Sequence, residues 1–188
     1  ADSGLKGLEF ACGIPGSVGG AVLMNAGAYG ASMQDVVCSA TIMDHSGEVK
    51  RVGAEEIGFS QRGSRLQNEK AILVAAEFSL APGRAPEIHG EIERLLALRS
   101  SNQPLSLPSA GCIFKNPSGK GAGRYIDAAG LKGLRIGGAQ VSEKHANFIV
   151  NLGNATARDV LALMERVKQV VWERFGVTLE PEVRIVGG

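Results

Sequence analysis

The sequence has no excess of charge of either sign. Its 20 lysines and arginines stand against 19 aspartates and glutamates, which gives a formal net charge of +1 at pH 7. A protein that binds nucleic acid or an acidic membrane surface gathers a basic excess on one face. The balance of charge speaks against both classes, so we expect neither nucleic acid nor a membrane among the partners.

Long apolar runs and paired cysteines are also lacking. No stretch approaches the roughly 20 apolar residues of a membrane span, and no basic-then-apolar segment resembles a signal peptide. The three cysteines, Cys12, Cys38 and Cys112, show no Cys-x-x-Cys spacing, and His145 has no second His or Cys at ligand spacing. We therefore expect no metal site, and a cytoplasmic protein whose thiols stay reduced.

Glycine is what the sequence has in abundance: 26 of 188 residues, about twice the usual share of roughly 7%. The glycines cluster in residues 13–30 and 111–138, where tight turns or a close approach of the backbone to a ligand would require them. The chain is 44% hydrophobic and 21% charged, which is typical of globular proteins. Its length suits one large domain or two small ones.

The pattern of apolar residues predicts both strands and helices. Strands are expected at residues 36–44, 48–52, 71–78, 147–152 and 182–186. Helices are expected at residues 87–99, 125–129 and 157–175. Strands and helices do not alternate strictly, so an α+β fold is favoured over a doubly wound parallel sheet.

Local signals support particular boundaries. Residues 45–47 form a short turn between the first two strands. Thr156 and Asp159 resemble a capping box at the start of the last helix, and Gly176 ends it. The polar segment 100–108 contains two prolines and is the best candidate for a domain boundary. We expect domains at residues 1–102 and 103–188.

The glycine-rich loop at residues 13–20 is the first candidate site. Successive glycines let backbone N–H groups converge on phosphate oxygens, and a helix that starts near Val18 would add its positive end. The loop matches neither the Rossmann fingerprint nor the Walker sequence. A simple packing turn is the alternative, and spacing alone does not decide between them.

A second candidate is the loop around Cys112, at residues 109–117. An unperturbed thiol has a pKa of about 8.5, so it is mostly protonated near neutrality and could donate a proton or act as a nucleophile. The alternative is that Cys112 simply packs in the interior, as cysteine often does. Lys115 and Asn116 add a cation and an amide to the same loop.

A third candidate is the predicted strand at residues 182–186. Because side chains alternate between the two faces of a strand, Glu182 and Arg184 would lie on the same face. That face is either part of a functional site or simply exposed to solvent.

Several short blocks, in this order along the chain, carry a family resemblance. They are Ile14-Pro15-Gly16-Ser17-Val18-Gly19-Gly20, Asn25-Ala26-Gly27-Ala28-Tyr29-Gly30, Gly111-Cys112-Ile113-Phe114-Lys115-Asn116-Pro117, Gly130-Leu131-Lys132-Gly133, His145-Ala146-Asn147-Phe148 and Leu179-Glu180-Pro181-Glu182-Val183-Arg184. The chain resembles UDP-N-acetylenolpyruvoylglucosamine reductase, also called UDP-N-acetylmuramate dehydrogenase, of the type without an extra substrate loop. The blocks extend over nearly the whole chain.

The resemblance implies a fold and a reaction. It implies the second subdomain of a two-part, PCMH-like FAD-binding fold, followed by a small α+β substrate-binding domain. The family's N-terminal FAD subdomain has no counterpart before Gly4, and we expect it as a partner. NADPH would reduce FAD, and hydride would then pass to C3 of UDP-N-acetylenolpyruvoylglucosamine. A proton at C2 completes UDP-N-acetylmuramate for peptidoglycan synthesis.

The resemblance also implies roles for residues. Cys112 is expected to donate the proton, while Arg62 and Glu182 polarise the substrate carboxylate. Substrate contacts are expected at Lys115, Asn116 and His145. Flavin contacts are expected at Ile14, Pro15, Gly16, Ser17, Val18, Asn25, Ala26, Gly27 and Arg184.

Two departures and two alternatives accompany these expectations. Gln61 precedes Arg62 where the family has a tyrosine, and His145 replaces a glutamine found in some relatives. One alternative is a module that binds a UDP-sugar without redox chemistry. The other is a flavin oxidase of similar fold, since fold analogy alone does not decide chemistry.

Overall fold

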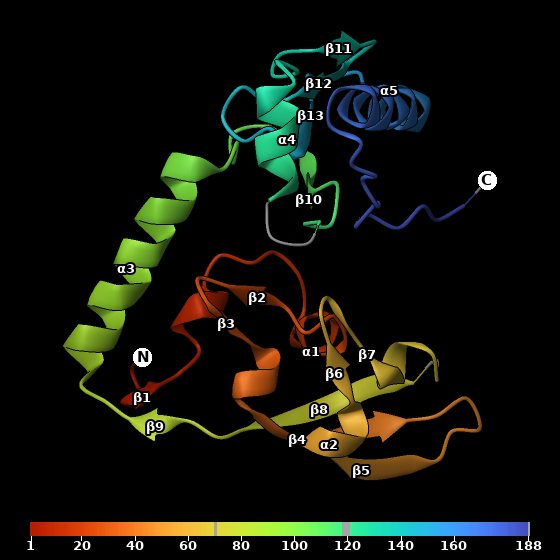
Figure 1. Ribbon diagram of the computed structural model, residues 1–188. Coiled ribbons are helices and arrows are strands. Elements are labelled where there is room, and N and C mark those ends of the chain that lie inside the picture. Colours follow the sequence, from red (N-terminus) through yellow and green to blue (C-terminus); the bar gives the residue numbers. More distant parts are fainter. Residues whose placement is uncertain (70, 118–120, 188) are drawn as a thin grey trace. The chain divides into compact units, whose positions relative to one another are not determined.

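The computed structural model describes residues 1–69, 71–117 and 121–187, and it falls into two compact units (Figure 1). The first unit is Ala1–Arg99 and the second begins at Ser100. Each unit has its own cluster of buried apolar side chains. The mixed content of helices and strands confirms the α+β class.

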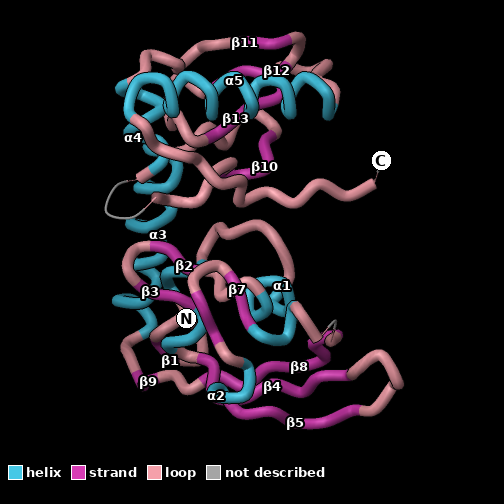
Figure 2. The backbone as a smooth tube through the Cα atoms, turned by 45° about the vertical axis from the view of Figure 1, so that its right-hand side comes forward, coloured by secondary structure: helices cyan, strands magenta, loops and turns pink. Residues whose placement is uncertain are grey.

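The first unit contains a three-stranded antiparallel sheet in the order β5-β4-β8 (Figure 2). Its elements are β1 (Leu5–Lys6), α1 (Val18–Leu23), β2 (Gly27–Ala28), β3 (Ala31–Ser32), β4 (Val37–Met43), β5 (Val49–Gly53), α2 (Ala54–Ile57), β6 (Phe59–Ser60), β7 (Gly63–Ser64), β8 (Ile72–Phe78) and β9 (Ala81–Pro82). Short 3-10 helices lie at Glu9–Ala11, Met33–Asp35 and Arg65–Gln67. The predicted hairpin and third strand are confirmed.

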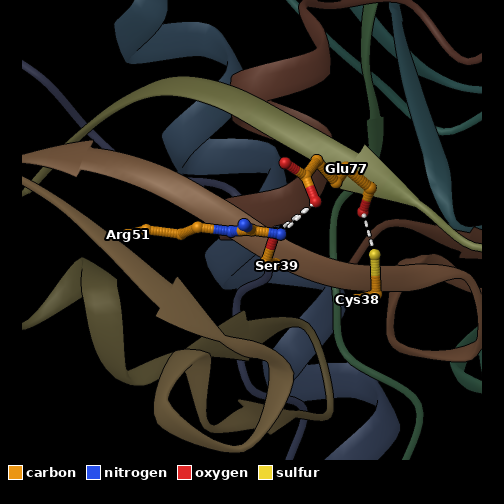
Figure 3. A network of polar contacts seen from close by, with 4 residues as sticks. All are labelled: Cys38, Ser39, Arg51 and Glu77. Atoms are coloured by element: carbon orange, nitrogen blue, oxygen red, sulfur yellow. Dashed lines mark hydrogen bonds and ion pairs between the residues drawn. The ribbon is translucent and has the colours of Figure 1, made fainter.

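Polar side chains cross the sheet of the first unit (Figure 3). Arg51 of β5 pairs with Glu77 of β8, and its Nε donates to Ser39 Oγ of the central strand at 3.1 Å. Ser39 Oγ in turn donates to Glu77 Oε2 at 3.1 Å. The network joins three strands, but Arg51 and Glu77 are exposed and their ion pair contributes little to stability.

The helix α3 (Ala85–Asn102) spans the division between the units. It extends the helix predicted at 87–99 by a few residues at each end, which is the usual error of sequence-based boundaries. Ile88, Leu95 and Arg99 are buried along it.

The second unit is a four-stranded antiparallel sheet in the order β10-β13-β12-β11, with two helices. Its elements are β10 (Ser109–Cys112), α4 (Ala122–Ala128), β11 (Arg135–Ile136), β12 (Ala139–Val141), β13 (Phe148–Asn151) and α5 (Ala157–Phe175). In both views α5 lies along the strands β12 and β11 (Figures 1 and 2). Its apolar stripe fills the core of this unit.

The last helix forms as its sequence predicts. Thr156 Oγ1 accepts from the backbone N–H of Asp159 at 3.1 Å, and Asp159 Oδ2 accepts from the N–H of Thr156 at 2.9 Å. This capping box satisfies two N–H groups that the helix itself cannot pair. At the other end Gly176 adopts φ of 63°, which is the left-handed conformation that ends many helices.

Three expectations about the second unit need correction. Residues 182–186 do not form a strand. Pairing is limited to a single bridge between Phe114 and Pro181, flanked by hydrogen bonds from the N–H of Lys115 to the carbonyl of Glu180 and from the N–H of Glu182 to the carbonyl of Ile113. Helix α4 begins at Ala122 rather than at 125, and the loop expected around Cys112 begins with the strand β10.

No helix within the described ranges is both long and apolar enough to cross a bilayer.

Candidate active site

The second unit holds a pocket of about 360 Å³. Three of the residues singled out from the sequence line it together: Cys112, Asn116 and His145. They come from the end of β10, the segment that follows it, and the turn before β13. The pocket is also lined by four charged side chains to which the sequence analysis assigned no role: Arg124, Asp127, Lys132 and Lys144.

The thiol of Cys112 is positioned by an irregularity in β10. Ser109 pairs with Val150 and Cys112 with Phe148, so the register shifts by one residue between them. Gly111 adopts φ of 81° within this bulge, a conformation that favours glycine. Cys112, paired with Phe148, lines the pocket, while Ile113 beside it is buried in the core.

Asn147 holds the chain that follows Cys112. Its Nδ2 donates to the carbonyl of Phe114 at 2.8 Å, and its Oδ1 accepts from the N–H of Phe114 at 3.0 Å. The side chain thus pairs with the backbone of Phe114 as a neighbouring strand would. The N–H and carbonyl of Phe114 are buried, and leaving them without hydrogen bonds would be costly. Sequence reasoning gave this residue no role, although an amide at the first position of the strand predicted at 147–152 was a usable signal.

His145 is fixed as a neutral side chain. Its Nδ1 accepts from the backbone N–H of Asn147 at 3.2 Å, and its ring packs edge-on against Phe148 with centroids 4.9 Å apart. Burial lowers the pKa of His145 below its usual 6.5, and the nearby charge of Lys132 lowers it further. A hydrogen bond with its own backbone carbonyl acts the other way, with an effect smaller than that of burial and larger than that of Lys132. Since Nδ1 is an acceptor, the proton of the neutral ring resides on Nε2.

Asn116 supports the helix beside it. Its Oδ1 accepts from the N–H of Ala122 at 3.0 Å, at the first residue of α4. Because an amide also carries two donors, Asn116 can still donate toward the pocket.

Lys115 lies outside the lining of this pocket. Its Nζ is 3.3 Å from Glu180 Oε2, and both side chains are more than half exposed. The same segment approaches the site through its backbone: the N–H of Glu182 donates to the carbonyl of Ile113 at 2.7 Å. The backbone of Glu182 is therefore hydrogen-bonded to Ile113, the residue next to Cys112. Arg184, two residues further on, is exposed.

The first unit has its own pocket, of about 420 Å³, at the start of α1. Six of the expected flavin contacts line it: Ile14, Pro15, Gly16, Ser17, Val18 and Ala26. Met24 and Met33 add to a largely apolar wall. Ser17 caps the helix, since its Oγ accepts from the N–H of Gly20 at 3.1 Å.

Two further expected flavin contacts, Asn25 and Gly27, lie outside the lining of that pocket. The Asn25 amide is used within the protein: Nδ2 donates to Gln34 and to the carbonyl of Ser60, at 3.0 Å each. Gly27 forms a tight hairpin, where a Cβ would lie 2.8 Å from the carbonyl oxygen of Ala31.

Arg62 occupies the tip of the β6–β7 hairpin. Its φ is 58°, a left-handed conformation that is costly for a residue with a side chain. Its Nη1 donates to the carbonyl of Gly27 at 3.1 Å. Sequence patterns favour Gly or Asn at such a position, so an arginine there points to a use for its side chain.

Comparisons with known proteins identify the family of the chain. Residues 1–53 match the FAD binding domain family, and residues 103–186 match the C-terminal domain of UDP-N-acetylenolpyruvoylglucosamine reductase. The UDP-N-acetylenolpyruvoylglucosamine reductase 2 of Symbiobacterium thermophilum is 54% identical over 98% of this chain. The reductase of Latilactobacillus sakei is 52% identical over 97% of it.

A solved structure gives the same result. The crystal structure of UDP-N-acetylenolpyruvylglucosamine reductase from Thermus caldophilus is 43% identical and has a TM-score of 0.86 over 97% of this chain and 65% of its own. The fold and the two matched segments define the class as that of FAD-binding proteins with an added C-terminal domain. Within that class the chain belongs to the UDP-N-acetylenolpyruvoylglucosamine reductase family. It spans about 60% of the length of the curated relatives it matches.

Proposed function

We propose that this chain is the part of a UDP-N-acetylenolpyruvoylglucosamine reductase that binds the substrate and supplies the proton. The proposed reaction uses NADPH and FAD and yields UDP-N-acetylmuramate, a precursor of peptidoglycan. The observation that carries the proposal is the shared pocket of Cys112, Asn116 and His145. Residues 1–102 would then form the second FAD-binding subdomain and residues 103–188 the substrate-binding domain.

The residues have chemically distinct tasks in this proposal. Hydride addition to C3 leaves negative charge spread from C2 into the carboxylate of the substrate. A fixed cation at that place lowers the barrier, which is the role of Arg62. Glu182 helps through a hydrogen bond to the same carboxylate, since two bare carboxylates in contact would repel each other. The thiol of Cys112 delivers its proton to C2 and regains one from solvent.

The first unit fits a flavin. The largely apolar wall of its pocket suits a flat aromatic ring, and no neighbouring atom within 4 Å would meet a Cβ on Gly16, so the backbone is open to a close approach there. Ile14, Pro15, Gly16, Ser17, Val18 and Ala26 would hold the cofactor. Bound FAD would supply the hydride that adds to C3.

The proposal also implies a partner for the chain and a cellular compartment for the reaction. The family's N-terminal FAD subdomain would complete the cofactor site, in the same polypeptide or as a separate chain. The cysteines at positions 12, 38 and 112 form no disulfide within the described residues, which fits a reducing compartment, so we place the reaction in the cytoplasm.

Cys112→Ala in a protein that includes the N-terminal FAD subdomain tests the assignment. NADPH should still bleach the flavin absorption at the normal rate. Reoxidation by substrate should slow by about 10²- to 10⁴-fold, because a general acid typically contributes that much. Cys112→Ser is the matched control and should retain a large part of the rate. Reoxidation of the alanine variant at the normal rate would refute the role of Cys112.

A second candidate is a module that binds a UDP-sugar without redox chemistry. It is favoured by one observation, namely that every residue lining the Cys112 pocket belongs to the second unit. Visible absorption of the purified chain, with and without added FAD, separates the two. Flavin colour supports the reductase. The module is supported if the chain stays colourless even with the N-terminal subdomain and calorimetry shows that it binds UDP-N-acetylglucosamine.

A further inference from the structure

Asn25 combines burial with an uncommon backbone conformation. It is 6% exposed and adopts φ of 45°, in the left-handed region. Among the described residues other than glycine, a positive φ occurs at Asn25, Tyr29 and Arg62. Asparagine tolerates this conformation better than most residues, and a buried amide needs partners for its polar atoms. Strained residues gather at functional sites, so the contacts of the Asn25 amide are informative.

The Asn25 amide is bonded on all sides within the first unit. Its Nδ2 donates to Gln34 Oε1 and to the carbonyl of Ser60, at 3.0 Å each, and its Oδ1 accepts from the N–H of Gln34 at 2.9 Å. These backbone partners determine the orientation of the amide, because an N–H can only donate and a carbonyl can only accept. An amide nitrogen has two hydrogens, so the two contacts use the full donor capacity of Asn25.

A second hydrogen bond joins the same two segments in the opposite direction. Arg62 Nη1 donates to the carbonyl of Gly27 at 3.1 Å. These two residues lie two positions beyond Ser60 and Asn25, respectively. Each segment thus offers one side chain and one backbone carbonyl to the other, and we call this pair of bonds the Asn25–Arg62 clasp. A strained residue persists where its surroundings hold it, so the clasp accounts for the φ of 58° at Arg62.

We propose that Asn25 is a positioning residue for Arg62. By holding the carbonyl of Ser60, it fixes the end of β6 and with it the place from which the Arg62 side chain extends. A guanidinium has five N–H donors, more than the bond to Gly27 needs, so the held side chain can also bind a carboxylate. This inference rests on the proposed function, in which Arg62 is the fixed cation. A charge lowers a barrier only while it stays where charge develops, so a loosened hairpin would weaken its effect.

NMR relaxation of the chain without cofactor tests the clasp itself. Asn25→Gly removes the amide, and glycine adopts a positive φ without strain. Backbone order parameters at Gln61, Arg62 and Gly63 should fall from about 0.85, the value of rigid backbone, to below about 0.6. Those of β4 and β8 should stay unchanged. Asn68→Gly is the matched control, at an exposed asparagine of the same unit, and should leave the hairpin rigid.

Kinetics of the protein that includes the N-terminal FAD subdomain test the consequence. In Asn25→Gly, saturating substrate should reoxidise the reduced flavin about 10- to 100-fold more slowly, because a misplacement of about 1 Å can cost that much. Reduction of the flavin by NADPH should keep its normal rate. Asn25→Asp should behave alike, because its carboxylate still accepts from the Gln34 N–H but has no donor for Ser60. It covers the case in which the glycine variant folds poorly.

A double variant shows whether Asn25 acts through Arg62. Residues that act as a unit have non-additive effects. Once Arg62→Gly has removed the guanidinium, adding Asn25→Gly should change the reoxidation rate by no more than about twofold. If Asn25 served only the general stability of the unit, the two losses would multiply.

Three results would overturn the inference. They are a rigid hairpin in both Asn25 variants, normal reoxidation by both of them, and losses that multiply in the double variant. In each of these cases a slow Arg62→Gly enzyme would leave the proposed function intact. Normal reoxidation by Arg62→Gly would instead refute the proposed role of Arg62, and with it the catalytic use of the clasp.

Discussion

The backbone N–H of Asn147 donates to Nδ1 of His145 across 3.2 Å. This single contact determines which ring nitrogen of His145 bears the proton. An imidazolium would have a proton on Nδ1, directly facing the Asn147 N–H, so ionisation of His145 requires the ring to turn away. The turn before β13 is therefore built for a neutral histidine.

Acidification should destabilise the second unit through His145. Its pKa is lowered on folding, so the unfolded chain binds this proton more readily than the folded chain. The free energy of unfolding should fall as the pH drops below about 6.5, the usual value, and should level off below the lowered pKa of the folded state. Urea unfolding between pH 5 and pH 8 measures this slope.

His145→Gln is the control for that slope. Glutamine keeps a side-chain donor and does not titrate, so this variant should lose the contribution of His145 to the pH dependence. Direct NMR titration of the imidazole gives an independent check. A pKa at or above 6.5 in the folded protein would contradict the assignment.

Asn147→Ala should strongly destabilise the second unit. The change removes two buried hydrogen bonds and leaves the N–H and carbonyl of Phe114 without their partner. We expect a loss of about 2–4 kcal/mol in the free energy of unfolding, because each buried polar group left unpaired costs about 1–3 kcal/mol. Asn154→Ala, at an exposed position, should cost far less. Equal losses in denaturant unfolding would show that the Asn147 amide has no special role.

Arg62→Gly should separate stability from activity. Glycine adopts positive φ without strain, so the variant should keep the stability of the first unit or gain up to about 1 kcal/mol. In the longer protein the rate of substrate reduction should fall about 10²- to 10³-fold, since a preorganised charge is lost. Thermal unfolding and flavin reoxidation measure the two effects. A variant that unfolds more easily and still turns over normally would show a structural role instead.

Two glycine substitutions should have opposite effects. A Cβ on Gly138 would lie 2.6 Å from the main-chain carbon of Asn154, closer than real side chains approach. Gly138→Ala should therefore cost at least about 1–3 kcal/mol through overpacking. Gly90 lies within α3, and a methyl group there would meet no atom within 4 Å, so Gly90→Ala should raise stability by about 0.5–1 kcal/mol. Denaturant midpoints that move in the same direction would contradict this account.

The periodicity of apolar residues predicted the elements that depend on residues nearby in the sequence. Helix α5 is an example, since its apolar stripe, the capping box at Thr156 and the glycine at position 176 together predict where it lies and where it ends. The β4–β5 hairpin is similar, because a short turn joins two strands that pair with each other. In both cases the partners are close in sequence.

Elements that depend on distant partners were missed or wrongly predicted. Residues 109–112 hold small side chains with little strand preference, and they form β10 because β13 pairs with them. Residues 182–186 have the alternating pattern of a strand, but their pairing ends with the hydrogen bond from Glu182 to Ile113 and no ladder develops. Strand formation in these segments is a property of the packed unit.

The candidate site shows the same limit. The resemblance singled out Cys112, Asn116 and His145, and the structure brings these three to one pocket. Lys115, one residue from Asn116, belongs to the surface, while Arg124 and Lys144 look like ordinary solvated cations in the sequence. Only the packing of α4 beside the turn before β13 reveals which charges meet.

The bulge in β10 decides where this segment can change in length. Side chains alternate along a strand, so Cys112, which pairs with Phe148, borders the pocket, while Ile113 beside it lies in the core. Loss of the extra residue between Ser109 and Cys112 would leave both of their pairs in place and would remove only the kink at Gly111. This part of the chain can therefore shorten by one residue without reversing the faces of the thiol and the isoleucine.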